Sequence, residues 1–188
     1  MNKSIGIILN SNQVGGIPKL SAMMANDISN NYTEVFIYVP IIPFYTYYVS
    51  IFKKSIFWLL KIVPFYFFKW LFQKKNCLED LLDETKISKK KIQIKFYLYK
   101  IKNLDLTIHD RLILHGIGSV IECKNIYPQE KQIYLVNQIE EINHGAQHQE
   151  LYKNIRKNFK GKVITHCNFM KQFLINNVKD LRIVPNPI

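Results

Sequence analysis

The sequence is poor in cysteine, and its cysteines form no pattern. Cys77, Cys123 and Cys167 are the only three in 188 residues, and they stand about 45 positions apart. Such spacing builds neither a disulfide framework nor a paired metal or redox motif, so it indicates a reducing compartment. With 48% hydrophobic residues, a chain of this length can bury enough apolar surface to fold as one domain without cross-links.

We also expect no secretory signal peptide. The first residues, MNKSIGIILN, hold only about five apolar side chains before Asn10 and no cleavage site of small residues. A signal peptide needs a longer apolar core than this. We therefore expect a cytoplasmic chain.

Arginine is scarce although the chain is strongly basic. Lysine and arginine number 26 against 14 acidic residues, a net charge of +12, yet Arg111, Arg156 and Arg182 are the only arginines. Proteins that read nucleic acid favour the bidentate guanidinium group for phosphate and base contacts. Nucleic acid is therefore the weakest of the candidate partners, and we expect none.

Acidic residues are absent from positions 44–75, where charge and aromatic side chains concentrate. This stretch holds six lysines and 13 of the 25 aromatic residues. Lysines interleaved with aromatic rings suit an anionic membrane surface, because the rings anchor at the interface and the lysines reach the headgroups. We predict a membrane-facing helical insert over residues 43–76. Its predicted membrane contacts are Lys53, Lys54, Phe57, Trp58, Lys61, Phe65, Phe68, Lys69 and Trp70.

The insert lacks the uninterrupted apolar run of about 20 residues that a membrane-spanning helix needs. Lysines interrupt the run and Pro64 divides it, so we expect two short interfacial helices, Tyr47–Val63 and Pro64–Gln73, with proline at the first position of the second. The alternatives are an aromatic core subdomain or an oligomer interface, because a helix that is hydrophobic all round can simply be buried.

The rest of the chain alternates short apolar runs with helical patterns. This order predicts an α/β protein with a parallel sheet, whose ligand crevice lies beyond the carboxyl ends of the strands. Several of the apolar runs end in polar or small residues, which would gather at that edge. Strands are expected over 5–9, 34–39, 92–98, 111–114, 132–136, 162–165 and 181–184, and helices over 20–28, 78–86, 151–159 and 168–176.

A glycine loop follows the first expected strand. Residues Asn10–Gly16 (NSNQVGG) stand between a strand and a helix, where backbone N–H groups and the helix dipole favour an anion. The loop matches neither GxGxxG nor a Walker loop. Phosphate binding and an ordinary tight turn therefore both stay open for Gly15 and Gly16.

One group of residues has the spacing of metal ligands. Glu140, His144 and His148 are four positions apart, as ligands on one helical face would be. Gly145 interrupts that helix, however, and no fourth ligand follows. We therefore predict no metal site.

The remaining histidines form no recognisable catalytic pattern, and no Ser-His-Asp, Cys-His or paired-carboxylate arrangement can be picked out by spacing. His109 and His166 are expected to be polar residues at strand edges. His115 precedes Gly116 at the end of an expected strand, where a site residue and a satisfied structural histidine are both open.

The order of these features resembles the N-terminal, acceptor-side half of a family 4 glycosyltransferase of the GT-B fold. The similar features are the glycine loop before a helix, the strand ending in His115-Gly116, the strand 162–165 with Asn168 opening a helix, and the terminal Val184-Pro185-Asn186-Pro187-Ile188. Family members carry a V-x-P-N-G-[IV]-like motif there, with glycine in place of Pro187. The resemblance covers the chain apart from residues 41–90 and implies one Rossmann-like domain over 1–188, a parallel sheet with flanking helices.

The resemblance implies residue roles only where positions match. It implies that Gly15 and Gly16 approach the phosphates and sugar of a nucleotide-sugar donor, which is a substrate and not a cofactor. Many members have a catalytic histidine after the next strand, where this chain has Asn137-Gln138, so the catalytic residues stay unassigned. The matching residues on the acceptor side of the cleft are His115, Gly116, Asn137, Gln138 and Glu140.

The implied function is transfer of a sugar to a lipid-linked or surface-polysaccharide acceptor, in polysaccharide or lipopolysaccharide biosynthesis. The chain would be peripheral on the inner face of the cell membrane. The family's C-terminal nucleotide-sugar domain is absent from this sequence, so we expect no measurable transfer by the chain alone. The alternative is a non-catalytic, membrane-associated module that anchors or recruits a separate donor-binding subunit.

Overall fold

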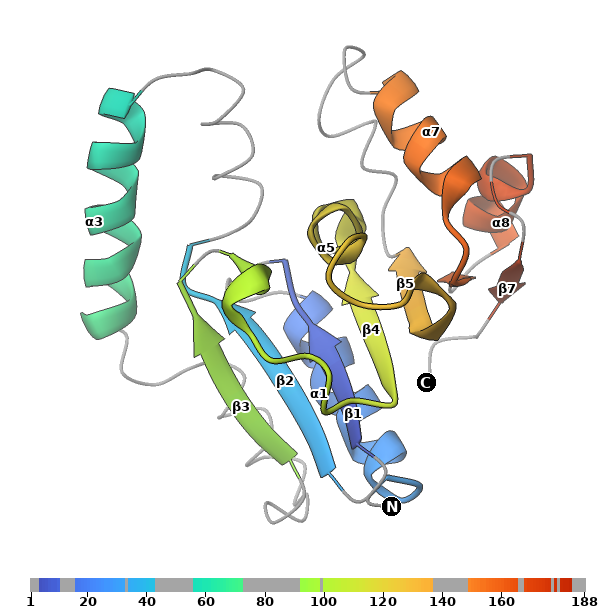
Figure 1. Cartoon of the computed structure of the whole chain (residues 1–188), viewed down its shortest axis with the longest axis horizontal. Helices are drawn as coiled ribbons and strands as arrows, with labels where there is room; N and C mark the ends of the chain where they lie inside the picture. Colours follow the sequence, from blue (N-terminus) through green and yellow to red (C-terminus); the bar gives the residue numbers. More distant parts are fainter. Residues whose placement is uncertain are drawn as a thin grey trace.

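The chain forms a seven-stranded parallel sheet flanked by helices in its computed structural model (Figure 1). The structure describes residues 4–10, 16–32, 34–42, 56–72, 92–98, 100–136, 149–165, 168–176, 178 and 180–183. The strands are β1 (Ser4–Ile8), β2 (Glu34–Pro40), β3 (Ile92–Tyr97), β4 (Arg111–His115), β5 (Gln132–Val136), β6 (Lys162–Thr165) and β7 (Leu181–Ile183). The helices are α1 (Gly16–Ser29), α3 (Ile56–Phe72), α5 (Gly116–Cys123), α7 (Gln149–Asn158) and α8 (Asn168–Leu174), with the short 3-10 helices η1 (Ile101–Asn103) and η2 (Gln129–Lys131).

The strand order is β3-β2-β1-β4-β5-β6-β7. The chain winds outward from β1 to β3, then returns to place β4 on the other side of β1, so Ile8 pairs with Tyr38 of β2 and with Leu114 of β4. The predicted α/β, Rossmann-like arrangement is confirmed. In such sheets ligands bind beyond the carboxyl ends of the strands, where the winding reverses. We call the carboxyl ends of β1 and β4 the switch point.

The inner strands form because they are apolar on both faces. Ile7 and Ile8 of β1 point to opposite faces, and each is 0% exposed. Runs buried on both faces are typical of parallel strands that are covered by helices. The edge strand β3 instead alternates between exposed and half-buried residues in its middle, as its period-two sequence predicts.

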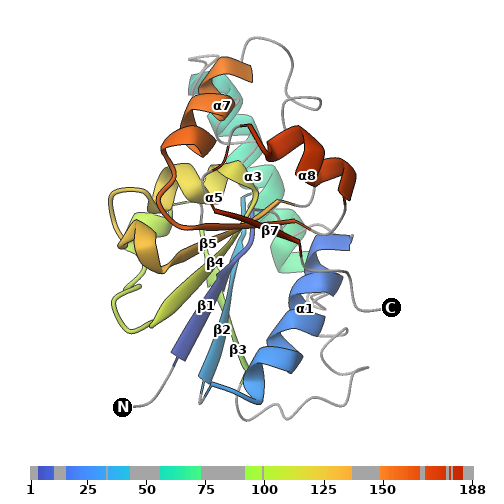
Figure 2. The same cartoon turned by 90° about the vertical axis from the view of Figure 1, so that its right-hand side faces the viewer.

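Helices cover both faces of the sheet, with α1 on one face and α5 on the other (Figure 2). Ala22 and Ala25 of α1 pack in one cluster with Ile37, and their small side chains let the helix approach the sheet closely. Ile117 and Val120 of α5 belong to the cluster on the opposite face, which also receives side chains from α7 and α8. The sheet is therefore the middle layer of three.

The predicted pair of helices in the aromatic insert is wrong where the structure describes it. Residues 56–72 form the single helix α3, and Pro64 lies inside it and not at a first helical position. Proline removes one N–H, so the carbonyl of Leu60 has no i+4 donor. Leu60 is exposed, so this turn of the helix lies at the surface of the protein. The rest of the insert over 43–76 lies outside the described residues, as does the helix expected over 78–86.

No helix in the described part of the chain is long and apolar enough to cross a membrane. α3 comes nearest in composition, but it has 17 residues and contains Lys61 and Lys69.

Position 6 needs glycine because buried side chains pack closely against its Cα atom. A Cβ atom at this position would stand 2.7 Å from Leu112 Cδ2 and 3.0 Å from His109 Cδ2, and both side chains are buried. We expect Gly6→Ala to lower the free energy of unfolding by about 2 kcal/mol, because packed neighbours would have to shift. Urea unfolding measures this loss. An unchanged midpoint would show that the space beside Gly6 can open without cost.

Candidate functional site

The candidate site is the switch point, where two helices begin. β1 ends at Ile8 and leads to Leu9 and Asn10, while α1 starts at Gly16. β4 ends at His115, and α5 starts at the next residue, Gly116. The first N–H groups of both helices therefore lie at the carboxyl edge of the sheet, where they have no partner within their own helix.

Gly116 and Asn10 fit together at the centre of this edge. Gly116 has a φ of +77°, a conformation that residues with a Cβ rarely adopt. A Cβ on Gly116 would also overlap the Asn10 carboxamide, whose Nδ2 is its nearest atom and whose Cγ would be 3.1 Å away. The backbone of α5 thus begins directly against the Asn10 side chain.

Two polar atoms at the carboxyl edge lack hydrogen bonds. Within the described residues, Asn10 Oδ1 and Thr165 Oγ1 are buried and have no hydrogen-bond partner. Thr165 ends β6 and is 0% exposed. A buried polar atom left unsatisfied costs about 1–3 kcal/mol, and a ligand that supplies the missing bond recovers that cost.

His115 holds the two sides of the switch point together. Its ring is 0% exposed, and Nε2 lies 3.2 Å from the hydroxyl of Ser21, which belongs to α1. The Ser119 hydroxyl donates to the His115 carbonyl at 3.1 Å. The side chain predicted to line the cleft is therefore inside the protein, where it links β4 to α1 and positions the start of α5.

The site combines backbone hydrogen-bond donors with a side-chain acceptor. The first turn of α5 presents backbone N–H groups, and His115 at its N-cap makes no side-chain capping bond to them. Oxygen atoms of a phosphate or a saccharide can accept from these groups. Asn10 Oδ1 is an acceptor, which a hydroxyl group can satisfy but a fully ionised phosphate cannot. The combination suits a ligand that carries both hydroxyl and anionic oxygen atoms.

The structure brings only part of the predicted site together. Gly16 is the first residue of α1, and His115 and Gly116 lie at the switch point. Ser21 and Thr165 were missed, because nothing in an apolar helical pattern or a strand end marks a serine or threonine as a site residue. The predicted site residues outside the described part of the chain are Gly15, Asn137, Gln138 and Glu140.

No group of potential metal ligands occurs among the residues that the structure describes. Glu140, His144 and His148 are not among them, so the prediction that they bind no metal stays a prediction.

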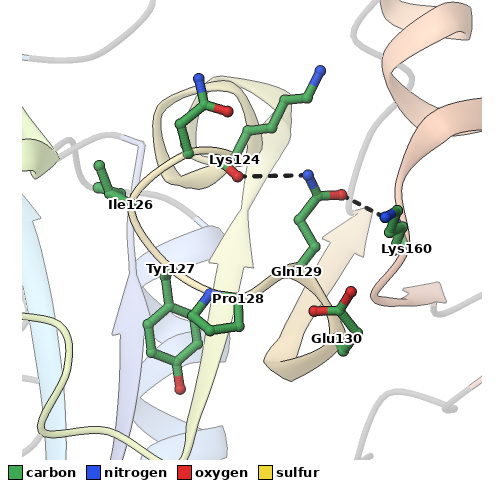
Figure 3. A pocket seen from close by; sticks show the side chains of 8 residues that line it. Lys124, Ile126, Tyr127, Pro128, Gln129, Glu130 and Lys160 are labelled. Atoms are coloured by element: carbon green, nitrogen blue, oxygen red, sulfur yellow. Dashed lines mark hydrogen bonds between the residues drawn. The ribbon is translucent and has the colours of Figure 1, made fainter.

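A pocket of about 410 Å³ lies at the other edge of the sheet (Figure 3). Gln129 crosses it, donating to the Lys124 carbonyl at 3.5 Å and accepting from the Lys160 N–H at 3.3 Å. The pocket is formed by the segments that lead into the amino ends of β5 and β6, so it lies away from the edge where parallel sheets bind ligands. Its lining residues are Lys124, Asn125, Ile126, Tyr127, Pro128, Gln129, Glu130 and Lys160.

A second buried cluster surrounds His109, in the segment before β4. The Ser4 hydroxyl donates to the Ile108 carbonyl at 2.6 Å, so it must accept from His109 Nδ1 at 3.0 Å. Nε2 then carries no proton and accepts from the Tyr38 hydroxyl at 2.7 Å. The Tyr127 hydroxyl donates to the His109 carbonyl at 2.7 Å. The predicted polar residue at a strand edge is therefore a core histidine with both ring nitrogens bonded.

Burial controls protonation in this cluster. Desolvation, with a smaller contribution from the Lys95 charge, lowers the pKa of His109 from 6.5 to about 4. Burial, with a contribution from the Asp105 charge, raises the pKa of Tyr38 to about 12. His109 is thus neutral near pH 7, and the cluster holds the segment before β4 on the sheet.

Comparisons with protein-family models, with curated proteins and with solved structures find no match. The functional assignment therefore depends on the fold and on the chemistry of the switch point.

Proposed function

We propose that this chain is the acceptor-binding half of a glycosyltransferase that transfers a sugar from a nucleotide sugar to a lipid-linked or surface-polysaccharide acceptor. The main support for the proposal is the contact between the Asn10 side chain and the first residue of α5 at the switch point. The carboxamide oxygen of Asn10, which lacks a hydrogen bond, and the backbone N–H groups that open α5 match a saccharide joined to phosphate, which offers hydroxyl donors and anionic acceptors together.

The described residues at this edge supply binding groups more readily than catalytic ones. β1, β5 and β6 end in Ile8, Val136 and Thr165, and none of these side chains is acidic or basic. Transfer from a nucleotide sugar needs charges that stabilise the leaving diphosphate, and such electrostatic effects are usually the largest in catalysis. In this proposal a separate donor-binding unit provides them.

Binding of a soluble acceptor analogue tests the proposal. The probe is a saccharide joined through diphosphate to a short, water-soluble prenyl chain. We expect it to bind more tightly than either the free saccharide or the prenyl diphosphate alone. Asn10→Ala should weaken binding about tenfold, because the ligand hydroxyl loses its acceptor.

Asn31→Ala is the matched control, since Asn31 is an exposed asparagine in the connection between α1 and β2. It should bind the probe like the wild type, and thermal melts should show both variants folded. Equal affinity of the wild type and a folded Asn10→Ala variant would remove Asn10 from the site and contradict the proposal.

The second candidate is a non-catalytic module that recruits a donor-binding subunit. The uncharged ends of β1, β5 and β6 favour it as much as they favour an acceptor-binding half. The same titration separates the two, because a recruiting module has no reason to bind a saccharide diphosphate at Asn10.

A further inference from the structure

α3 exposes an apolar stripe between Leu60 and Leu71. Leu60 is 65% exposed and Phe68 is 54% exposed, values far above those of core residues. In Figure 1 the helix stands apart from the sheet, on the side of the carboxyl ends of β2 and β3. The stripe consists of Leu60, Pro64, Phe67, Phe68 and Leu71, all of them exposed.

The spacing of these residues places them on one face. Positions 60, 64, 67, 68 and 71 follow the three- and four-residue steps of an amphipathic helix. At 1.5 Å per residue the stripe is about 17 Å long. Lys61, Phe65 and Lys69, also exposed, are four apart and form the adjoining face. Val63 and Tyr66 are half-buried and lie on the remaining side.

Charge decides between the surfaces that could cover the stripe. α3 contains Lys61 and Lys69 and no acidic residue. Two copies of the chain packed through this helix would bring four lysines together without a counter-charge, which opposes association. An anionic lipid surface supplies the opposite charge to the lysines and an apolar interior to the stripe.

We propose that α3 lies in the plane of an anionic lipid surface, with the stripe in the acyl region and Lys61 and Lys69 among the headgroups. Among the side chains that the structure describes, the residues that enter differ in part from those that the sequence predicts. Leu60, Phe67 and Leu71 join Phe68 in the stripe, whereas Phe65 lies between the two lysines at headgroup depth. The chain does not cross the bilayer in this arrangement.

This inference is independent of the proposed function, because α3 can bind lipid whatever the switch point binds. The test uses the full chain and vesicles without any saccharide, either phosphatidylcholine alone or phosphatidylcholine mixed with phosphatidylglycerol. We expect the wild type to bind the anionic vesicles at least tenfold more tightly at low salt, and salt to reduce this preference.

Two pairs of double variants separate the two faces of α3. Leu60→Ser/Leu71→Ser should weaken binding to anionic vesicles about tenfold or more at every salt concentration. Its control is Phe169→Ser/Ile175→Ser, which removes similarly exposed apolar side chains at the α8 end of the chain and should bind normally. Lys61→Gln/Lys69→Gln should mainly abolish the preference for anionic lipid, whereas Lys102→Gln/Lys157→Gln, exposed lysines elsewhere, should not.

Three results would overturn the inference. The first is no binding to anionic vesicles, and the second is equal weakening by the stripe variant and its α8 control. The third is a dimer of the wild type in sedimentation without lipid that Leu60→Ser/Leu71→Ser converts to a monomer, which would assign the stripe to a second copy of the chain. None of these results bears on saccharide binding at the switch point.

Discussion

Lowering the pH from 7 to 4 is expected to reduce the free energy of unfolding by about 3 kcal/mol through His109 alone. The pKa of this histidine falls from 6.5 to about 4 in the folded chain, and each unit corresponds to about 1.4 kcal/mol. Between these two values the unfolded chain binds the proton and the folded chain does not, so stability is lost as the pH falls. The loss begins near pH 6.5 and is complete below about pH 4.

Other groups titrate in the same range, so the test compares two proteins. Lys95 opposes protonation of His109, Asp105 and Asp110 favour it, and burial has the largest effect. Glu122, whose pKa is raised mainly by burial, acts in the opposite direction on acidification. Urea unfolding of the wild type and of His109→Gln from pH 7 to pH 4 isolates the histidine. The stability difference between them should shrink by about 3 kcal/mol, and parallel pH profiles would contradict the assignment.

Gly116→Ala is expected to destabilise the chain by about 3 kcal/mol, for two separable reasons. An alanine at a φ of +77° is strained, and its Cβ overlaps the Asn10 carboxamide. Combining it with Asn10→Ala removes the overlap but not the strain, so about half of the loss should be recovered.

A double-mutant cycle of Gly116→Ala and Asn10→Ala, measured by urea unfolding, tests this contact directly. A coupling free energy of about 1–2 kcal/mol is expected for side chains that collide. Additive effects of the two substitutions would mean that Asn10 and the start of α5 do not touch. The same result would argue against the contact between Asn10 and Gly116 on which the proposed site depends.

The sheet was predictable from the sequence because its inner strands are buried on both faces. Continuous apolar runs such as 5–9 and 133–136 have few other ways to bury every side chain in a chain of this length. The helix α5 was not predicted, since Gly116 and Gly118 both disfavour helix. Packing of Ile117 and Val120 against the sheet overrides that propensity.

Contacts between distant residues limited the prediction of the site. Ser21 and His115 are 94 positions apart, and Ser4 and His109 are 105 apart, so no local pattern joins them. His109 is buried partly because Gly6 leaves room for its ring, which only the packed structure reveals. Gly116 could be predicted at the strand end, but its contact with Asn10 could not.

The proposed site is tested most directly by locating where a saccharide diphosphate binds on the protein. Isotope-labelled chain titrated with the soluble acceptor analogue, and followed by amide NMR, reports each residue separately. Binding at the switch point predicts chemical-shift changes at the Asn10 side-chain amide and at the backbone amides of Gly116, Ile117 and Gly118, which open α5. Changes confined to Tyr127, Gln129 and Lys160 would place the ligand in the pocket at the opposite edge and contradict it.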